Sequence, residues 1–345
     1  MNNRRVGLAS ALLTTTFFLC FLASGQETQE TPSPFSSKLK CGETCSSFQQ
    51  SDTLPDKPAQ GVIRLAVGGD SRDDKNGVVP WAFKEAKNRG AQAFFFLGDM
   101  ELTAAEDDRF IKQTKQLGIP FYPAIGNHEV LTFGVLRLPK QTLAHVKKFK
   151  ETSLNSPAIN LAPLPDVVAY SVNLEGGIHL VALDNVSRKR EGFGRAQLTW
   201  LADDLRAASA AKKIILVGMH KGLANNPVTR HAMDEDGRHA ILNSNSALKL
   251  FNDFKVAMVF VSHSHMYAAY KQDPGGLPVR LTGGMGAPLV KGLAETDGGF
   301  HHFLLVDVAP GDPASIHVQV VKFPCSPPSC KPSVSEKDEA EETDD

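Results

Sequence analysis

Short apolar runs, each six to eight residues long, recur through the middle of this 345-residue chain and restrict its fold more than any other feature. We expect each run to form a buried or half-buried strand, because such runs are shorter than most helices and several are rich in Val, Ile and Phe. The expected strands are residues 62–69, 93–98, 121–126, 168–174, 179–184, 214–219, 256–261, 279–284 and 303–308.

Amphipathic stretches separate several of these runs and indicate helices. Residues 81–90, 108–118 and 194–208 fit the helical pattern and end near Gly or small residues. Strands that alternate with helices predict an α/β domain, and the denser strands of the second half predict a layered α/β sandwich. In such a fold the loops at the carboxyl ends of the strands carry the site.

The two ends of the chain differ in composition from its middle. Residues 1–25 join a basic start to an apolar stretch, the pattern of an export signal; an uncleaved membrane anchor is the alternative. Residues 26–60 are typical of a Ser/Thr/Pro-rich linker, and residues 331–345 of an acidic, disordered tail. One domain over residues 61–330 remains. We expect the mature protein to be periplasmic or secreted, without a stable membrane span.

Four cysteines follow the expected export signal, namely Cys41, Cys45, Cys325 and Cys330. An even number of cysteines in an exported chain predicts disulfides, and the sequence leaves their connectivity open. A structural zinc site is the competing interpretation, although the spacings differ from the usual pair of C-x-x-C knuckles.

Polar side chains that can bind metals follow five of the apolar runs. A histidine alone at a strand end is usually structural, but repeated carboxylate, carboxamide and imidazole groups at strand ends predict a site. Hard oxygen ligands mixed with imidazoles suit two first-row transition metals that share one carboxylate. The residues are Asp70, Asp99, Asn127, His128, His220, His263 and His265.

In order and content, the series GD, GD, GNHE, a single His and H-x-H resembles the calcineurin-like metallophosphoesterases over residues 61–310, and more distantly the purple acid phosphatases. The resemblance implies two mixed β-sheets flanked by helices, and two bound transition-metal ions, Mn, Fe or Zn. It implies that Asp99 bridges the two ions. It assigns Asp70 and His265 to one ion; the other is assigned to Asn127, His220 and His263.

The same resemblance implies the chemistry. A hydroxide that bridges the metals attacks phosphorus, and His128 donates a proton to the departing alkoxide. Glu129 either orients His128 or faces solvent. We therefore expect an exported phosphoester hydrolase, either a phosphatase or a phosphodiesterase. A catalytically weakened phosphate- or nucleotide-binding relative of the same fold is the alternative.

Two positions depart from the pattern of these families. Arg72 stands where most members have the histidine of an Asp-x-His motif, and Leu102 stands where purple acid phosphatases have a tyrosine. A guanidinium has no lone pair to offer a metal. We expect Arg72 to point toward the site and to bind a substrate phosphate oxygen, as a catalytic residue. A surface ion pair with Asp73 or Asp74 is the alternative.

Charge and loop composition bear on the substrate. The formal net charge of −1 gives no electrostatic reason to expect a nucleic-acid-binding surface. The expected partner is a phosphoester whose identity stays open, because specificity would lie in loops such as residues 221–245. His231 and His239 lie in that segment and are further candidates for substrate contacts.

Overall fold

The computed structural model describes residues 39–40, 48–100, 113–132, 135–136, 158–188 and 190–324. The expected export signal, the four cysteines of the mature chain, Leu102 and the acidic tail lie outside these residues. Among the described residues, none of the helices has the length and apolar character needed to span a membrane.

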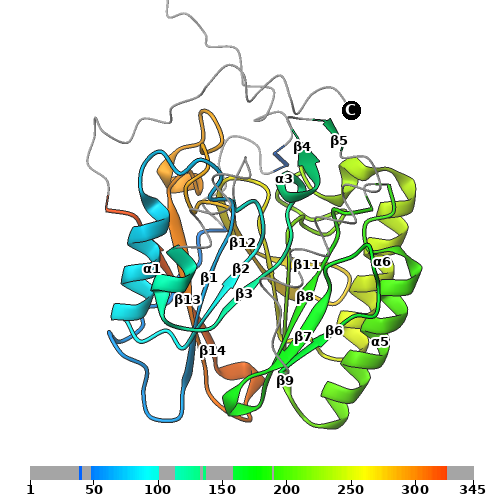
Figure 1. Ribbon diagram of the computed structural model, residues 1–345, viewed down its shortest axis with the longest axis horizontal. Coiled ribbons are helices and arrows are strands. Elements are labelled where there is room, and N and C mark those ends of the chain that lie inside the picture. Colours follow the sequence, from blue (N-terminus) through cyan, green and yellow to red (C-terminus); the bar gives the residue numbers. More distant parts are fainter. Residues whose placement is uncertain are drawn as a thin grey trace, which may run out of the picture. The chain divides into compact units, whose positions relative to one another are not determined.

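The first β-sheet has five strands in the order β14-β13-β1-β2-β3 (Figure 1). The three strands β1, β2 and β3 are parallel, whereas β13 and β14 are antiparallel to their neighbours. Their bounds are β1 Ile63–Gly68, β2 Ala93–Phe96, β3 Phe121–Pro123, β13 His302–Val308 and β14 Ile316–Lys322.

The second β-sheet has seven strands in the order β11-β12-β10-β9-β8-β7-β6. Strands β8, β9, β10 and β12 are parallel, and the outer strands are antiparallel. Their bounds are β6 Ile159–Leu161, β7 Tyr170–Asn173, β8 Ile178–Leu183, β9 Ile214–Met219, β10 Met258–Val261, β11 Tyr267–Gln272 and β12 Leu277–Thr282.

Helices cover the outer faces of both sheets (Figure 1). Helix α1, Val78–Asn88, packs on the first sheet; α5, Gly194–Ala210, and α6, Arg238–Asp253, pack on the second. Residues 113–117 are also helical, and several short elements lie elsewhere in the described chain. They are α3 Asn127–Val130, β4 Leu131–Thr132, β5 Val135–Leu136 and the 3-10 turns Glu175–Gly177, Met233–Asp236, Glu295–Asp297 and Pro313–Ser315.

Burial on both faces explains why the central strands are continuously apolar. All four residues of β2 are buried, and Phe94 packs edge-to-face against Phe83 of α1 with the ring centroids 5.1 Å apart. Two apolar clusters result: one contains α1, the first sheet and the facing side of the second sheet, and the other lies beneath α5 and α6. The ends of the central strands are therefore fixed by packing against helices on one face and against the other sheet on the opposite face.

This architecture confirms the predicted α/β sandwich of two mixed sheets. The nine expected strands are present with small shifts at their ends, but β4, β5, β6, β11 and β14 were not predicted. Residues 221–245 were expected to be a loop, and this is wrong from Arg238 onward because α6 begins there. The first buried residues of α6 are Ala240 and Ser244, whose small side chains give the start of the helix little apolar signal in the sequence.

A segment that precedes β1 lies along the outer edge of β14. The backbone N–H of Asp52 donates to the carbonyl oxygen of Val318 at 2.7 Å, and Asp52 Oδ2 accepts from the N–H of Val318 at 2.7 Å. The N–H of Val320 donates to Ser51 Oγ at 3.0 Å. These described residues of the expected 26–60 linker thus contact the domain.

Candidate metal centre

The carboxyl ends of five strands deliver polar side chains to one region between the sheets. Asp70 follows β1, Asp99 follows β2 and Asn127 follows β3; in the second sheet His220 follows β9 and His263 follows β10. Parallel strands end at the same edge, which brings these loops together. The carboxylate and imidazole residues are almost fully buried, with exposed fractions of 0–8% for Asp70, Asp99, His220, His263 and His265.

Two groups of possible ligand atoms overlap at Asp99. One group is Asp99, His220 and His263, and the other is Asp70, Asp99 and His265; within each group the atoms lie within 4.8 Å of one another. Two cations that share a carboxylate need this pattern. The predicted residues are thus brought together as the bridging assignment requires.

Hydrogen bonds leave the appropriate nitrogen of two histidines available to a cation. The Nδ1–H of His220 donates to the carbonyl oxygen of Leu97 at 2.9 Å, and the Nδ1–H of His265 donates to that of Pro288 at 2.7 Å. In a neutral imidazole the other nitrogen, Nε2, then carries the lone pair. Both Nε2 atoms face carboxylates, His220 toward Asp99 at 3.4 Å and His265 toward Asp70 at 3.5 Å.

The oxygen ligands are also oriented by hydrogen bonds. Asp70 Oδ2 accepts the backbone N–H of His263 at 2.8 Å, while the buried Oδ1 has no hydrogen-bond partner. Asn127 Oδ1 lies 2.8 Å from His220 Nε2. A buried carboxylate oxygen without a donor is unfavourable unless a cation occupies the site, so the donor set fits two transition-metal ions.

The backbone at three of these residues is in the left-handed region. The φ angles are 61° at Asp70, 54° at Asp99 and 71° at His263. Such angles cost about 1–3 kcal/mol in residues other than glycine and persist where the surroundings fix them. Gly126 is one such constraint, because a Cβ at this position would lie 2.1 Å from Asp99 Oδ1. The fold therefore holds the ligands in place at the expense of local strain.

Charges within the centre change the protonation of its members in the metal-free protein. Burial alone would raise the pKa of Asp99, but the imidazoles of His220 and His128 hold it far below its ordinary value. Burial opposes protonation of His220, but Asp99 raises its pKa to about 9. For His263, burial and the neighbouring His231 lower the pKa well below its ordinary value.

Glu129 has a role that neither sequence interpretation foresaw. The expectation that it orients His128 or faces solvent is wrong: its side chain is 3% exposed and accepts three backbone N–H groups. Those of Asp99 and Gly126 donate to Oε2 at 2.9 and 2.6 Å, and that of Met100 donates to Oε1 at 2.8 Å. Burial and the Asp99 carboxylate raise the pKa of Glu129 to about 8. Glu129 fastens the loop after β2 to the loop after β3.

His128 lies at the rim of the centre. Its backbone N–H donates to Asp99 Oδ1 at 2.9 Å, and its Nε2 is 3.8 Å from Asp99 Oδ2. The side chain is 15% exposed, whereas that of His220 is fully buried. An imidazole that reaches the carboxylate and still meets solvent can exchange protons with a bound substrate.

Arg72 is buried beside this centre. It is 5% exposed, its backbone N–H donates to the carbonyl oxygen of Asp99 at 3.1 Å, and its buried Nε has no hydrogen-bond partner. The alternative of a surface ion pair is not observed, because Asp73 pairs with Lys75 at 2.9 Å and Asp74 accepts the N–H groups at the start of α1.

The loop between β9 and α6 brings the candidate His231 to the centre, together with charged residues that the sequence did not single out. The ring of His231 stacks on that of His263 with centroids 3.9 Å apart, and His231 Nδ1 lies 2.8 Å from Glu235 Oε1. Lys221, next to His220, donates to Asp236 Oδ1 at 2.7 Å. The candidate His239 is exposed on α6 and is not part of this cluster.

Comparison with known proteins finds a family match over the region that contains these residues. A sequence model of calcineurin-like phosphoesterases matches residues 69–267, which confirms the resemblance predicted from the strand ends. No curated protein matches the chain. A dimetal phosphatase from Danio rerio superposes with a TM-score of 0.52 at 13% identity, over 76% of this chain and 99% of that chain. GAP50, the anchor in the inner membrane complex of Plasmodium, gives 0.50 at 11% identity over 76% and 90%. At these identities the superpositions show the fold alone.

Proposed function

Since the chain belongs to the calcineurin-like phosphoesterase family, we propose that it hydrolyses phosphoesters with the help of two metal ions. The observation that carries this proposal is the overlap of two ligand groups at Asp99. The fixed Nδ1–H donors of His220 and His265 add to it, because they direct Nε2 of each ring toward the carboxylates.

The residues fit Mn, Fe or Zn, which accept mixed oxygen and imidazole ligands. Asp70, Asp99 and His265 would hold one ion, and Asp99 with Asn127, His220 and His263 the other. When bound, such a pair of ions supplies an acidified water and clamps phosphate oxygens during in-line displacement. Glu129 acts through Asp99, whose position it fixes.

His128 is the residue that we propose as the proton donor to the leaving group. Its partial exposure keeps it in exchange with solvent, and its Nε2 lies at the side of the Asp99 carboxylate. Imidazole is suited to this role because its ordinary pKa lies near neutrality.

Arg72 is the residue that we propose to bind a substrate phosphate oxygen. Its guanidinium is buried, and no ion pair involves it among the described residues. A phosphate oxygen would supply the missing acceptor through a charge-assisted hydrogen bond. Arg72→Ala should then raise KM for a phosphoester, and Arg72→His should also tighten the metal held by Asp70. Equal metal affinity and kinetics in both variants would refute this role; Arg206→Ala on the exposed face of α5 is the control.

We further propose that the protein acts outside the cytoplasm, on the basis of the export pattern in residues 1–25.

Hydrolysis of 4-nitrophenyl phosphate and bis(4-nitrophenyl) phosphate, with and without Mn²⁺, tests the proposed activity. We expect metal-dependent turnover of at least one ester, abolished by Asp99→Asn. Metal binding and phosphate binding without turnover would favour the weakened relative instead. Absence of metal binding by the purified chain would reject the two-metal centre itself.

A further inference from the structure

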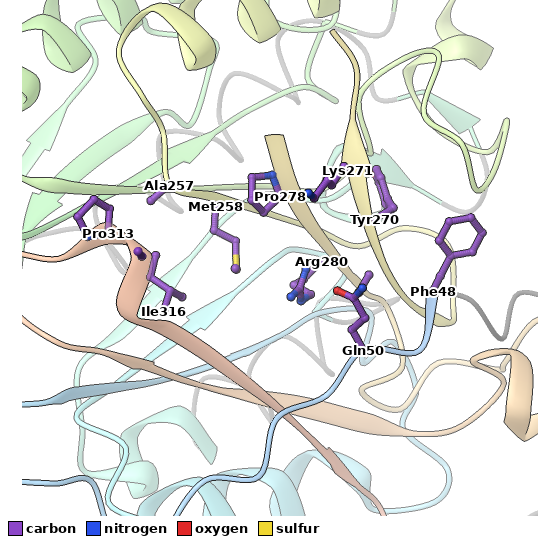
Figure 2. Close-up of a pocket in the computed structure, with 12 residues that line it drawn as sticks. Phe48, Gln50, Ala257, Met258, Tyr270, Lys271, Pro278, Arg280, Pro313 and Ile316 are labelled. Atoms are coloured by element: carbon purple, nitrogen blue, oxygen red, sulfur yellow. The ribbon is translucent and has the colours of Figure 1, made fainter. Parts of the chain in front are cut away.

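A cavity of about 490 Å³ lies away from the metal centre, at the other end of β10 (Figure 2). Ala257 and Met258 line it where β10 begins, whereas His263 and His265 follow the end of the same strand. Four strand residues span about 13 Å, so the two sites are separate. A cavity of this size is typical of small-molecule binding.

The cavity carries positive charge without acidic residues among its described lining. Arg280 and Lys271 project from the same face of the β11–β12 hairpin, since Arg280 pairs with Ala269 and Lys271 with Pro278 in register. Neither forms an ion pair with a described residue. Two cations that share one concave surface favour an anionic ligand.

Arg280 also has an unsatisfied donor. Its Nη1 donates to the carbonyl oxygen of Val279 at 3.2 Å, but its buried Nε has no hydrogen-bond partner. A buried N–H without an acceptor is destabilising, and native structures rarely leave one without a reason. The planar guanidinium matches the two oxygens of a carboxylate.

Apolar side chains make up part of the remaining lining, and the segment around Gln50 is held in place. Met258 and Ile316 form part of the wall, and in the view of Figure 2 Arg280 lies between Met258 and Gln50. The Tyr267 hydroxyl donates to the carbonyl oxygen of Gln50, which fixes this segment against β11. Gln50 adds an amide group beside the apolar side chains.

We propose that this cavity binds a small molecule that carries one carboxylate on an apolar body. Arg280 binds the carboxylate, Lys271 supplies a second positive charge at the rim, and Met258 and Ile316 contact the apolar part. Inorganic phosphate lacks the apolar part and binds more weakly there. Carboxylate binding at this site is independent of phosphoester hydrolysis.

Isothermal titration of the full chain with N-acetylphenylalanine and with its neutral C-terminal amide tests this proposal. We expect the acid to bind at least about tenfold more tightly than the amide, the effect of one charge-assisted hydrogen bond. Binding of the acid should survive Asp99→Asn, which separates this cavity from the metal centre.

Two variants locate the binding. Arg280→Met keeps an unbranched apolar stem but removes the guanidinium, and it should abolish the preference for the acid. Ala314→Trp should fill part of the cavity and weaken binding of both compounds. Arg206→Met on α5 is the matched control and should bind as the parent does. Equal affinity for acid and amide, no binding of either at about 10 mM, or unchanged binding by Arg280→Met and Ala314→Trp would each overturn the proposal.

Discussion

Replacing Glu129 by glutamine should weaken both the fold and the metal centre, although it changes a single oxygen to an NH₂ group. The amide oxygen of the glutamine can take the place of Oε2 and accept the N–H groups of Asp99 and Gly126. Its NH₂ group then faces the N–H of Met100, which loses its acceptor. One buried donor without an acceptor costs about 1–3 kcal/mol.

The expected loss of stability is measurable. At about 2–4 °C per kcal/mol for a domain of this size, a loss of about 2 kcal/mol lowers the melting temperature by about 4–8 °C. Because Glu129 fixes the loop that carries Asp99, the affinity for Mn²⁺ should fall by about tenfold or more. Thermal unfolding followed by circular dichroism and Mn²⁺ titration of the folded protein measure the two effects.

Asp204→Asn is the matched control for this experiment. Asp204 is a buried carboxylate on α5 that accepts hydrogen bonds from Asn160 and Ser171, and it contacts none of the proposed metal ligands. The Asp204→Asn variant should have a lower melting temperature than the parent but the same affinity for Mn²⁺. If Glu129→Gln melts within about 1 °C of the parent and binds Mn²⁺ equally well, Glu129 does not fasten the two loops.

Three other predictions concern separate parts of the chain. His128→Ala should slow turnover of a phosphoester while the metal content, measured by mass spectrometry, stays near that of the parent; loss of metal would make His128 a ligand. Burial lowers the pKa of His302 from 6.5 to about 4, so the unfolded chain binds a proton at a higher pH than the folded chain. Neutral His302 therefore contributes about 3 kcal/mol to the free energy of unfolding above pH 6.5, and this contribution is lost as the pH falls toward 4. Denaturant unfolding at several pH values measures the effect. The His302→Gln variant should not lose this stability at low pH, whereas a variant of the exposed His317, His317→Gln, should lose it as the parent does. Equal pH dependence of the unfolding free energy in the parent and both variants would contradict the assignment to His302. Thiol titration of the unreduced, unfolded mature protein should find no free cysteine, and four free thiols would refute the disulfides.

The strand-end residues could be predicted because each directly follows an apolar run that can be recognised in the sequence. Asp70, Asp99 and His220 directly follow apolar runs, and parallel strands bring such positions to one edge. Strands β11 and β14 were harder to find. In β14, an outer strand, polar residues alternate with apolar ones without a continuous apolar run, and only two of its seven residues are buried.

Other parts of the site depend on tertiary contacts that leave no local pattern. The role of Glu129 requires N–H groups from two loops that meet only in the folded chain, so the sequence around GNHEV does not reveal it. The stacking of His231 on His263 joins residues 32 positions apart through the path of the loop after β9. Predictions from sequence find the ligands more readily than the groups that hold them.

The segment that lies along β14 bears on self-association. An outer strand presents unpaired N–H and C=O groups that can pair with another chain and start aggregation. Ser51 and Asp52 occupy such groups on Val318 and Val320, partly with side-chain oxygens that a neighbouring strand could not extend. A chain shortened to begin after Asp52 would keep its metal ligands and yet expose a template for edge-to-edge growth. The residues before β1 thus cover an edge of the sheet that another strand could otherwise pair with.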